Sequence, residues 1–287
     1  MINDFLRQIQ GKYALNPIWE VELRHLQGGM SALRRFGGRA LGSASLAACI
    51  IAALASLQWS GQLHLTVVGW SILAAIGVML TADVAYVFTT VTHLGAEMRS
   101  GQWDLLRLTA LKAEAILDAK YNGAQLRTWR ILMVEISLRL FTVLLIALLA
   151  LMQAITHIML RFPDGILTIC LLVFVLSGVS VVYIREPWWR MRAVVALSLA
   201  ISASIRQESY AVLAALSALI AIRLTQAALL VGVPLFLLSA GRETFGLAGL
   251  CIIPYMIVLV CGITFWFYNF LRVNALRFAL RHAFRSE

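Results

Sequence analysis

The chain has 287 residues, of which 61% are hydrophobic and 13% are charged, and its formal net charge is +10. It is far more apolar than a soluble globular domain, and it lacks the composition of a disordered tail, a disulfide scaffold or a nucleic-acid-binding protein. We therefore expect an integral membrane protein, without a nucleic-acid partner, whose positive charge reflects its topology.

Six apolar runs are long enough to cross a bilayer, which takes a helix of about 20 residues. They cover residues 41–58, 63–93, 131–158, 165–184, 210–240 and 245–271. The predicted fold is an all-α integral membrane protein with six transmembrane helices over residues 41–271. A cytoplasmic N-terminal part (1–40) precedes this domain, and a basic cytoplasmic tail (272–287) follows it.

Arginine and lysine are concentrated in alternate connections between these runs. With the N-terminus in the cytoplasm, twenty of them lie in cytoplasmic segments, and only Arg161 and Arg242 lie in outside loops. Cytoplasmic connections of membrane proteins carry such a positive excess. We expect a multi-pass protein of the cytoplasmic (inner) membrane with both termini in the cytoplasm.

An amphipathic helix is predicted just before the first span. Asn16 can cap this helix, and Pro17 suits its first turn. Trp19 belongs to an apolar face at helical spacing, with charged side chains on the opposite face. We interpret it as a helix lying in the cytoplasmic interface, with a plain topological anchor as the alternative.

The connection over residues 94–130 is far longer than a membrane hairpin requires. Ser100 and Gly101 break the incoming helix, and residues 103–108 and 111–121 can each form a short helix. A short helix with Trp, Leu and Arg side chains, held between two spans, suits insertion into a groove on a cytoplasmic partner. A solvated loop with ordinary charge pairs is the alternative.

Four Asp, Glu or Arg residues fall within the predicted spans, where such groups are costly and face a partner or a water-filled cavity. They are Asp83, Glu135, Arg139 and Arg223. Glu135 and Arg139 are one helical turn apart and can pair with each other. Asp83 and Arg223 either pair across two helices or line a translocation path.

The segment 193–205 is apolar but too short to span. We predict an interfacial or re-entrant helix within the cytoplasmic segment 185–207, entered through Pro187 with Trp188 and Trp189 as interface anchors.

The sequence has no G-x-x-x-x-G-K-[ST] loop to bind nucleotide phosphates. It has no metal-ligand spacing, and we interpret His64, His93 and His157 as interface residues rather than haem ligands. The chain is therefore expected not to be an enzyme, and energy from ATP would have to come from another subunit.

Two motifs resemble the permease subunits of ABC-2 type ATP-binding-cassette (ABC) transporters. N-P-I-W-E-V-E-L-R, before the first span, is similar to the elbow helix of that family. Its elbow positions here include Asn16, Pro17, Trp19, Glu22 and Arg24.

The second motif lies between the second and third spans and reads E-M-R-S-G-Q-W-D-L-L-R-L-T-A-L-K-A-E-A-I. It is similar to the coupling-helix region of the family, which docks on the nucleotide-binding subunit. Its matching positions are Glu97, Gly101, Trp103, Asp104, Leu106, Thr109 and Leu111. Gln102 and Ala110 depart from the Thr and Pro usual in the family.

The resemblance implies a dimer of permeases, with a second copy or a paralogue, driven by separate ABC ATPase subunits and exporting a substrate. ATP and Mg would be held by the ATPase, with no cofactor in this chain. Trp103, Leu106 and Arg107 are expected to contact the ATPase, and membrane lipid is the other partner. Two alternatives stay open: a non-transporting anchor or scaffold subunit, and a secondary carrier driven by an ion gradient through Asp83 or Glu135.

Overall fold

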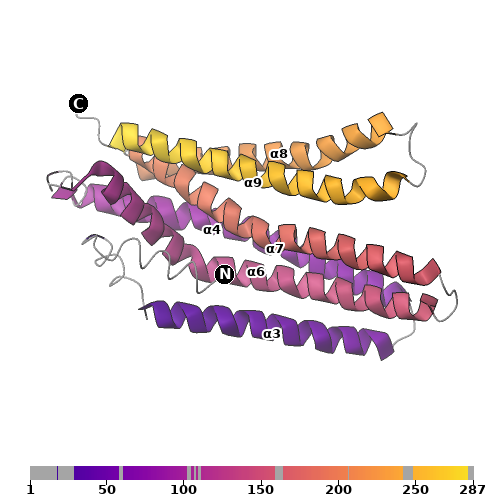
Figure 1. Cartoon of the computed structure of the whole chain (residues 1–287). Helices are drawn as coiled ribbons and strands as arrows, with labels where there is room; N and C mark the ends of the chain where they lie inside the picture. Colours follow the sequence, from indigo (N-terminus) through magenta and orange to yellow (C-terminus); the bar gives the residue numbers. More distant parts are fainter. Residues whose placement is uncertain are drawn as a thin grey trace.

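The computed structural model describes residues 18, 29–57, 61–101, 105, 106, 108, 111–158, 164–205, 207–241 and 248–283. Within these residues the chain forms six long helices and no strand, so the all-α prediction is confirmed. The helices are α3 (Gly29–Leu57), α4 (Gly61–Arg99), α6 (Ala113–Ile158), α7 (Asp164–Ser204), α8 (Glu208–Gly241) and α9 (Ala248–Ala283). They lie side by side in an elongated bundle (Figure 1).

Five of the helices contain a stretch that is long and apolar enough to cross a bilayer. Among the described residues, these stretches are Arg35–Leu54, Thr66–Arg99, Ala113–Met152, Glu208–Leu229 and Val258–His282. Large apolar side chains such as Trp70, Leu213 and Val258 are exposed on them, as contact with lipid requires. The length and composition of its helices make the chain a multi-pass membrane protein. The sixth predicted span, 165–184, is the first half of α7, which is not among these five.

The bundle has two flanks and a central layer (Figure 1). The helix α3 lies along one side and packs on α6, whereas α8 and α9 lie along the opposite side. Between them, α7 packs on α4, α6 and α9. The core at this junction includes Tyr86, Trp129, Leu132, Met191 and Val195, all fully buried.

The helix α6 begins earlier than the predicted third span. Its 46 residues make it about 69 Å long, more than twice the thickness of a hydrocarbon core. The short helix predicted over 111–121 is instead the first part of α6, which begins at Ala113. Ile116, Leu117 and Tyr121 are buried in this part, so the buried face of α6 extends to its N-terminal end. The connection between α4 and α6 is correspondingly shorter than the predicted 94–130.

The structure also differs from the prediction over residues 185–207. Instead of ending near Ile184 and giving way to a separate interfacial or re-entrant helix, α7 continues through Pro187 to Ser204. Val194, Val195 and Ala196 are buried in the main core. Four charged residues at 185–192 split the apolar run in the sequence. Two of them, Glu186 and Arg190, lie inside the bundle.

Candidate functional site

Six charged side chains meet inside the bundle and form what we call the ion-pair network. They are Asp83 on α4, Glu135 and Arg139 on α6, Glu186 and Arg190 on α7, and Arg223 on α8. The Arg223 side chain is the most exposed of the six, at 17%. Three carboxylates face three guanidinium groups, so the formal charges of the network balance.

Two helices each contribute a carboxylate and an arginine at the same spacing. In E-x-x-x-R the two side chains lie one turn apart on one face of a helix. The spacing brings Arg139 Nη2 to 2.9 Å from Glu135 Oε1, and Arg190 Nη1 to 3.2 Å from Glu186 Oε2. The packing of α6 on α7 then joins the two pairs, because Arg139 Nη2 is also 2.8 Å from Glu186 Oε2.

Arg190 is the centre of the network. Its side chain is completely buried, and its Nε lies 2.8 Å from Asp83 Oδ1. Its guanidinium also pairs with Glu135 and Glu186, so this one side chain contacts carboxylates from three helices. A buried guanidinium is tolerable only with such compensation, since an unpaired buried charge is strongly destabilising.

Arg139 also satisfies the backbone where proline interrupts α7. Pro187 has no N–H to donate to the carbonyl of Tyr183, four residues earlier in the helix. Arg139 Nη1 donates to that carbonyl at 2.8 Å. The guanidinium carbon lies 4.7 Å from the centroid of the Tyr183 ring, within range of a cation–π interaction. This contact explains how α7 continues through a proline.

Arg223 joins α8 to the network. Its Nε donates to Asp83 Oδ2 at 2.7 Å, and its Nη1 donates to Gln226 Oε1 at 2.9 Å. Of the two roles left open for Asp83 and Arg223, the structure contains the ion pair across helices.

Two tyrosines complete the hydrogen bonding. The buried Tyr268 hydroxyl on α9 lies 2.9 Å from Glu186 Oε1 and 2.7 Å from Gln226 Oε1. Tyr86 on α4 donates to Glu135 Oε2 at 3.3 Å. The network therefore connects five helices, α4 and α6 to α9.

This arrangement suits a structural clamp better than a reactive centre. Each carboxylate lies within ion-pair distance of at least two arginines, and none is offered singly to a ligand. In the described part of the chain, no group of three or more His, Cys, Asp or Glu side chains could hold a metal ion. Because the five helices share these contacts, a change in the angle of one helix is resisted by the others.

A smaller polar cluster lies where α4 ends. Glu97, one of the residues expected to couple to an ATPase, is 8% exposed. Its Oε1 accepts a hydrogen bond from Lys120 Nζ at 2.7 Å and lies 3.2 Å from His93 Nδ1. Glu97 therefore ties the end of α4 to the first turns of α6.

The segment after α4 turns sharply and presents two leucines. Gly101 has a left-handed φ of +71°, and Leu105 N–H donates to the Gly101 carbonyl at 3.2 Å. Leu105 is 66% exposed and Leu108 is 83% exposed. Leu106 instead packs inward, against the start of α6.

One apolar cluster brings together residues from both sequence motifs. Ile18, from the predicted elbow helix, is buried against Ile116 and Ala119 of α6, and Leu106 and Leu111 pack on the same cluster. The other predicted site residues of these motifs lie outside the described residues. They are Asn16, Pro17, Trp19, Glu22, Arg24, Trp103, Asp104, Arg107 and Thr109.

The turn at Gly101 gives a direct prediction. A β-branched side chain is disfavoured at a positive φ, so Gly101→Val should cost about 1–2 kcal/mol, whereas Gly101→Asn should cost less. We expect a lower midpoint in a thermal unfolding curve of the detergent-purified protein for the valine variant. Equal midpoints for the valine and asparagine variants would contradict the left-handed turn.

Sequence reasoning does not find Glu186 and Arg190 of the network, because the basic residues of the segment 185–207 are typical of a cytoplasmic loop. It also misses three uncharged side chains that hydrogen-bond to the network, Tyr86, Gln226 and Tyr268. A signal for two of them was present, since Glu186 and Arg190 repeat the E-x-x-x-R spacing of Glu135 and Arg139. Gln226 and Tyr268 are isolated polar residues in apolar runs and carry no such signal.

Comparison with known proteins gives no relative: no family model, no curated protein and no solved structure matches the chain.

Proposed function

We propose that this chain is the permease subunit of an ABC transporter of the ABC-2 type. It has six spans with both termini in the cytoplasm, works as a dimer, and exports its substrate using ATP hydrolysed by separate ATPase subunits. The observation that carries the proposal is the cluster at the start of α6, where Ile18 of the elbow motif meets Leu106 and Leu111 of the coupling motif. Two motifs recognised separately in the sequence thus share one packing site.

The exposed leucines support a docking role for the segment after α4. Leu106 and Leu111 hold it on α6, while Leu105 and Leu108 project from it. Exposed leucines on a rigid turn suit the apolar groove of a partner. Trp103 and Arg107, in the same segment, are proposed to add to this contact.

The proposed mechanism follows from what the segment connects. It joins α4, which carries Asp83, to α6, which carries Glu135 and Arg139. ATP binding would close the ATPase subunits and displace the segment, and the ion-pair network would make the attached helices move as one body. ATP and Mg act only in the partner, and the substrate path runs between the two permeases.

The balanced charges count against a secondary carrier. Such a carrier needs a carboxylate that gains and loses a proton or cation during each cycle. Asp83 and Glu135 are each paired with two arginines in a buried site, so neither carboxylate is offered singly to a proton or a cation. A scaffold subunit remains the second candidate, and the next experiment separates it from a permease.

The test is affinity purification of the tagged chain in mild detergent, with identification of bound proteins and an ATPase assay. We expect a phosphate-loop ATPase to co-purify with wild type. A variant with Leu105→Glu and Leu108→Glu should lose that ATPase, because charges cannot enter an apolar groove without a large desolvation cost. Arg281→Ala, at an exposed position in the last turn of α9, is the control and should retain the ATPase. A stable complex without any ATPase would favour the scaffold.

A further inference from the structure

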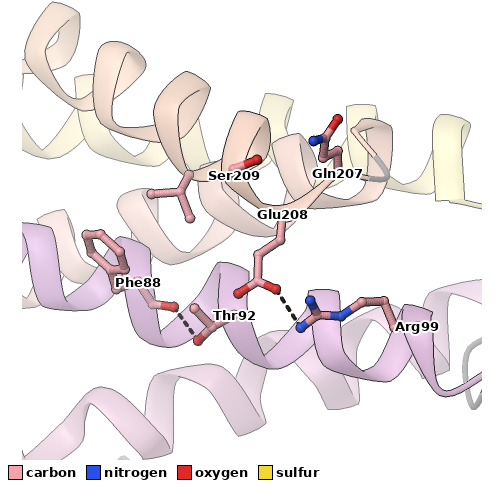
Figure 2. Close-up of a pocket in the computed structure, with 7 residues that line it drawn as sticks. Phe88, Thr92, Arg99, Gln207, Glu208 and Ser209 are labelled. Atoms are coloured by element: carbon pink, nitrogen blue, oxygen red, sulfur yellow. Dashed lines mark hydrogen bonds and ion pairs between the residues drawn. The ribbon is translucent and has the colours of Figure 1, made fainter.

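A groove opens between the C-terminal part of α4 and the start of α8. It is lined by Phe88, Thr92 and Arg99 from α4, and by Gln207, Glu208, Ser209 and Val212 from the α8 side. Figure 2 shows Glu208 descending from α8 towards α4, where it meets Arg99. Glu208 Oε2 lies 2.5 Å from Arg99 Nη2.

The Glu208 side chain packs against α4 beside a glycine. Gly95 is buried, and the Cγ of Glu208 lies 3.5 Å from the position a Cβ would occupy on it. The Glu208 side chain therefore lies across α4 and reaches Arg99. Phe88 and Val212 line the apolar part of the groove, and Arg99, Gln207 and Ser209 form its polar rim.

The groove lies where the outer face of α4 changes from apolar to polar. Leu73, Leu80, Val84 and Phe88 are exposed at helical spacing along this face. One turn later comes Thr92, whose hydroxyl donates to the Phe88 carbonyl, and two turns after that comes the exposed Arg99. An apolar face exposed to lipid that ends in a charged rim marks the boundary between hydrocarbon and headgroups.

The rim carries both signs of charge at one point. The Arg99 side chain is 65% exposed, so guanidinium N–H groups remain for an anion, and Glu208 has a second carboxylate oxygen for a cation. An isolated basic site would favour an anionic ligand. An adjacent guanidinium and carboxylate instead complement a ligand that carries a phosphate and an ammonium group close together.

We propose that this groove binds one phospholipid with a zwitterionic, primary-ammonium headgroup. The phosphate binds Arg99, the ammonium binds Glu208, and Gln207 and Ser209 offer further hydrogen bonds. One acyl chain lies along Val212 and Phe88 and continues down the exposed apolar face of α4. The site requires only that these helix ends lie at the membrane boundary, so it is independent of the proposed transport function.

The experiment is native mass spectrometry of the delipidated, detergent-purified full chain titrated with single lipids. We expect phosphatidylethanolamine to bind more tightly than phosphatidylglycerol, which lacks the cation, and than diacylglycerol, which lacks the headgroup. Arg99→Gln combined with Glu208→Gln should raise the Kd for phosphatidylethanolamine about tenfold, through the loss of charge-assisted hydrogen bonds. Arg281→Gln, an exposed arginine on α9, should leave that Kd unchanged.

A second variant tests the apolar part without changing charge. Val212→Trp fills the groove and should also weaken phosphatidylethanolamine binding. This variant keeps the proposal testable if the double glutamine variant does not fold. Soluble glycerophosphoethanolamine should fail to displace the lipid. Displacement by that headgroup, equal affinity for phosphatidylglycerol, or an unchanged Kd in both groove variants would each overturn the proposal.

Discussion

Replacing Arg190 by Met will sharply reduce the amount of folded protein. Among the described residues, Arg190 is the one side chain that pairs with Asp83, Glu135 and Glu186 together, and its replacement by methionine leaves the network with one excess negative formal charge. Removing one partner of a buried ion pair costs about 3–5 kcal/mol. Because a whole fold is stabilised by only about 5–15 kcal/mol, this single loss is severe. The measurement is the yield and thermal stability of monodisperse protein by fluorescence-detected size-exclusion chromatography in detergent.

Three further variants test whether the loss of folded protein in Arg190→Met comes from the unbalanced network. Arg185→Met, on the same helix but exposed, should change stability little. Arg190→Lys keeps the charge but loses the planar donors that reach several carboxylates at once, so its stability should be intermediate. Adding Glu186→Gln to Arg190→Met restores neutrality and should recover part of the loss. If Arg190→Met were as stable as Arg185→Met, Arg190 would not be the centre of a structural network.

The ion-pair network shows what sequence reasoning could reach and where it failed. Asp83 and Arg223 were detectable because a charge inside an apolar run is conspicuous. Glu186 and Arg190 were missed because several charges together lowered the local hydropathy, and a rule that counts basic residues assigns such a group to a loop. The repeated E-x-x-x-R spacing of Glu135/Arg139 and Glu186/Arg190 is the signal in the sequence that links the two segments. Which carboxylate meets which arginine depends on how α6 and α7 pack, and one sequence does not determine that.

The course of α7 illustrates a second limit. Pro187 is a reasonable place to end a helix, because proline lacks the N–H that donates to the carbonyl four residues earlier. In this fold Arg139, on another helix, donates to the Tyr183 carbonyl instead. A local rule fails when tertiary structure supplies the missing donor. The apolar residues after Pro187 then continue the same helix, and several of them are buried in the core.

The start of α6 illustrates a third limit of prediction from sequence. Residues 113–130 carry polar and charged side chains, so hydropathy alone places them in a connection. Their buried face, including Ile116 and Leu117, packs against the rest of the bundle, and the helix continues far beyond the thickness of a membrane. The amphipathic pattern of this stretch was sufficient to predict a helix, but not its continuity with the span that follows.

Neutralising both Asp83 and Arg223 will destabilise the protein less than the sum of the two single neutralisations. Asp83→Asn leaves Arg190 and Arg223 with an uncompensated positive charge, and Arg223→Gln leaves a carboxylate with one guanidinium fewer. The double variant keeps the network neutral, so its stability should exceed that expected from the sum of the single losses. For residues in direct contact, such a coupling is typically about 0.5–3 kcal/mol. Thermal unfolding of the four proteins in one detergent measures it.

The same four proteins distinguish a clamp from a substrate path. Path residues would leave the folded yield and the unfolding midpoint unchanged in the single variants, while altering the activity of the complex. If the two side chains form a structural clamp, the single variants should have a lower folded yield and a lower unfolding midpoint. The activity per folded molecule should then be retained. Arg223 is partly exposed and Asp83 is not, so Asp83→Asn should be the more damaging single change. If the stability losses of the two single variants were additive in the double variant, the two side chains would act independently. The balance of charges in the network would then not explain why six charged side chains lie inside a membrane protein.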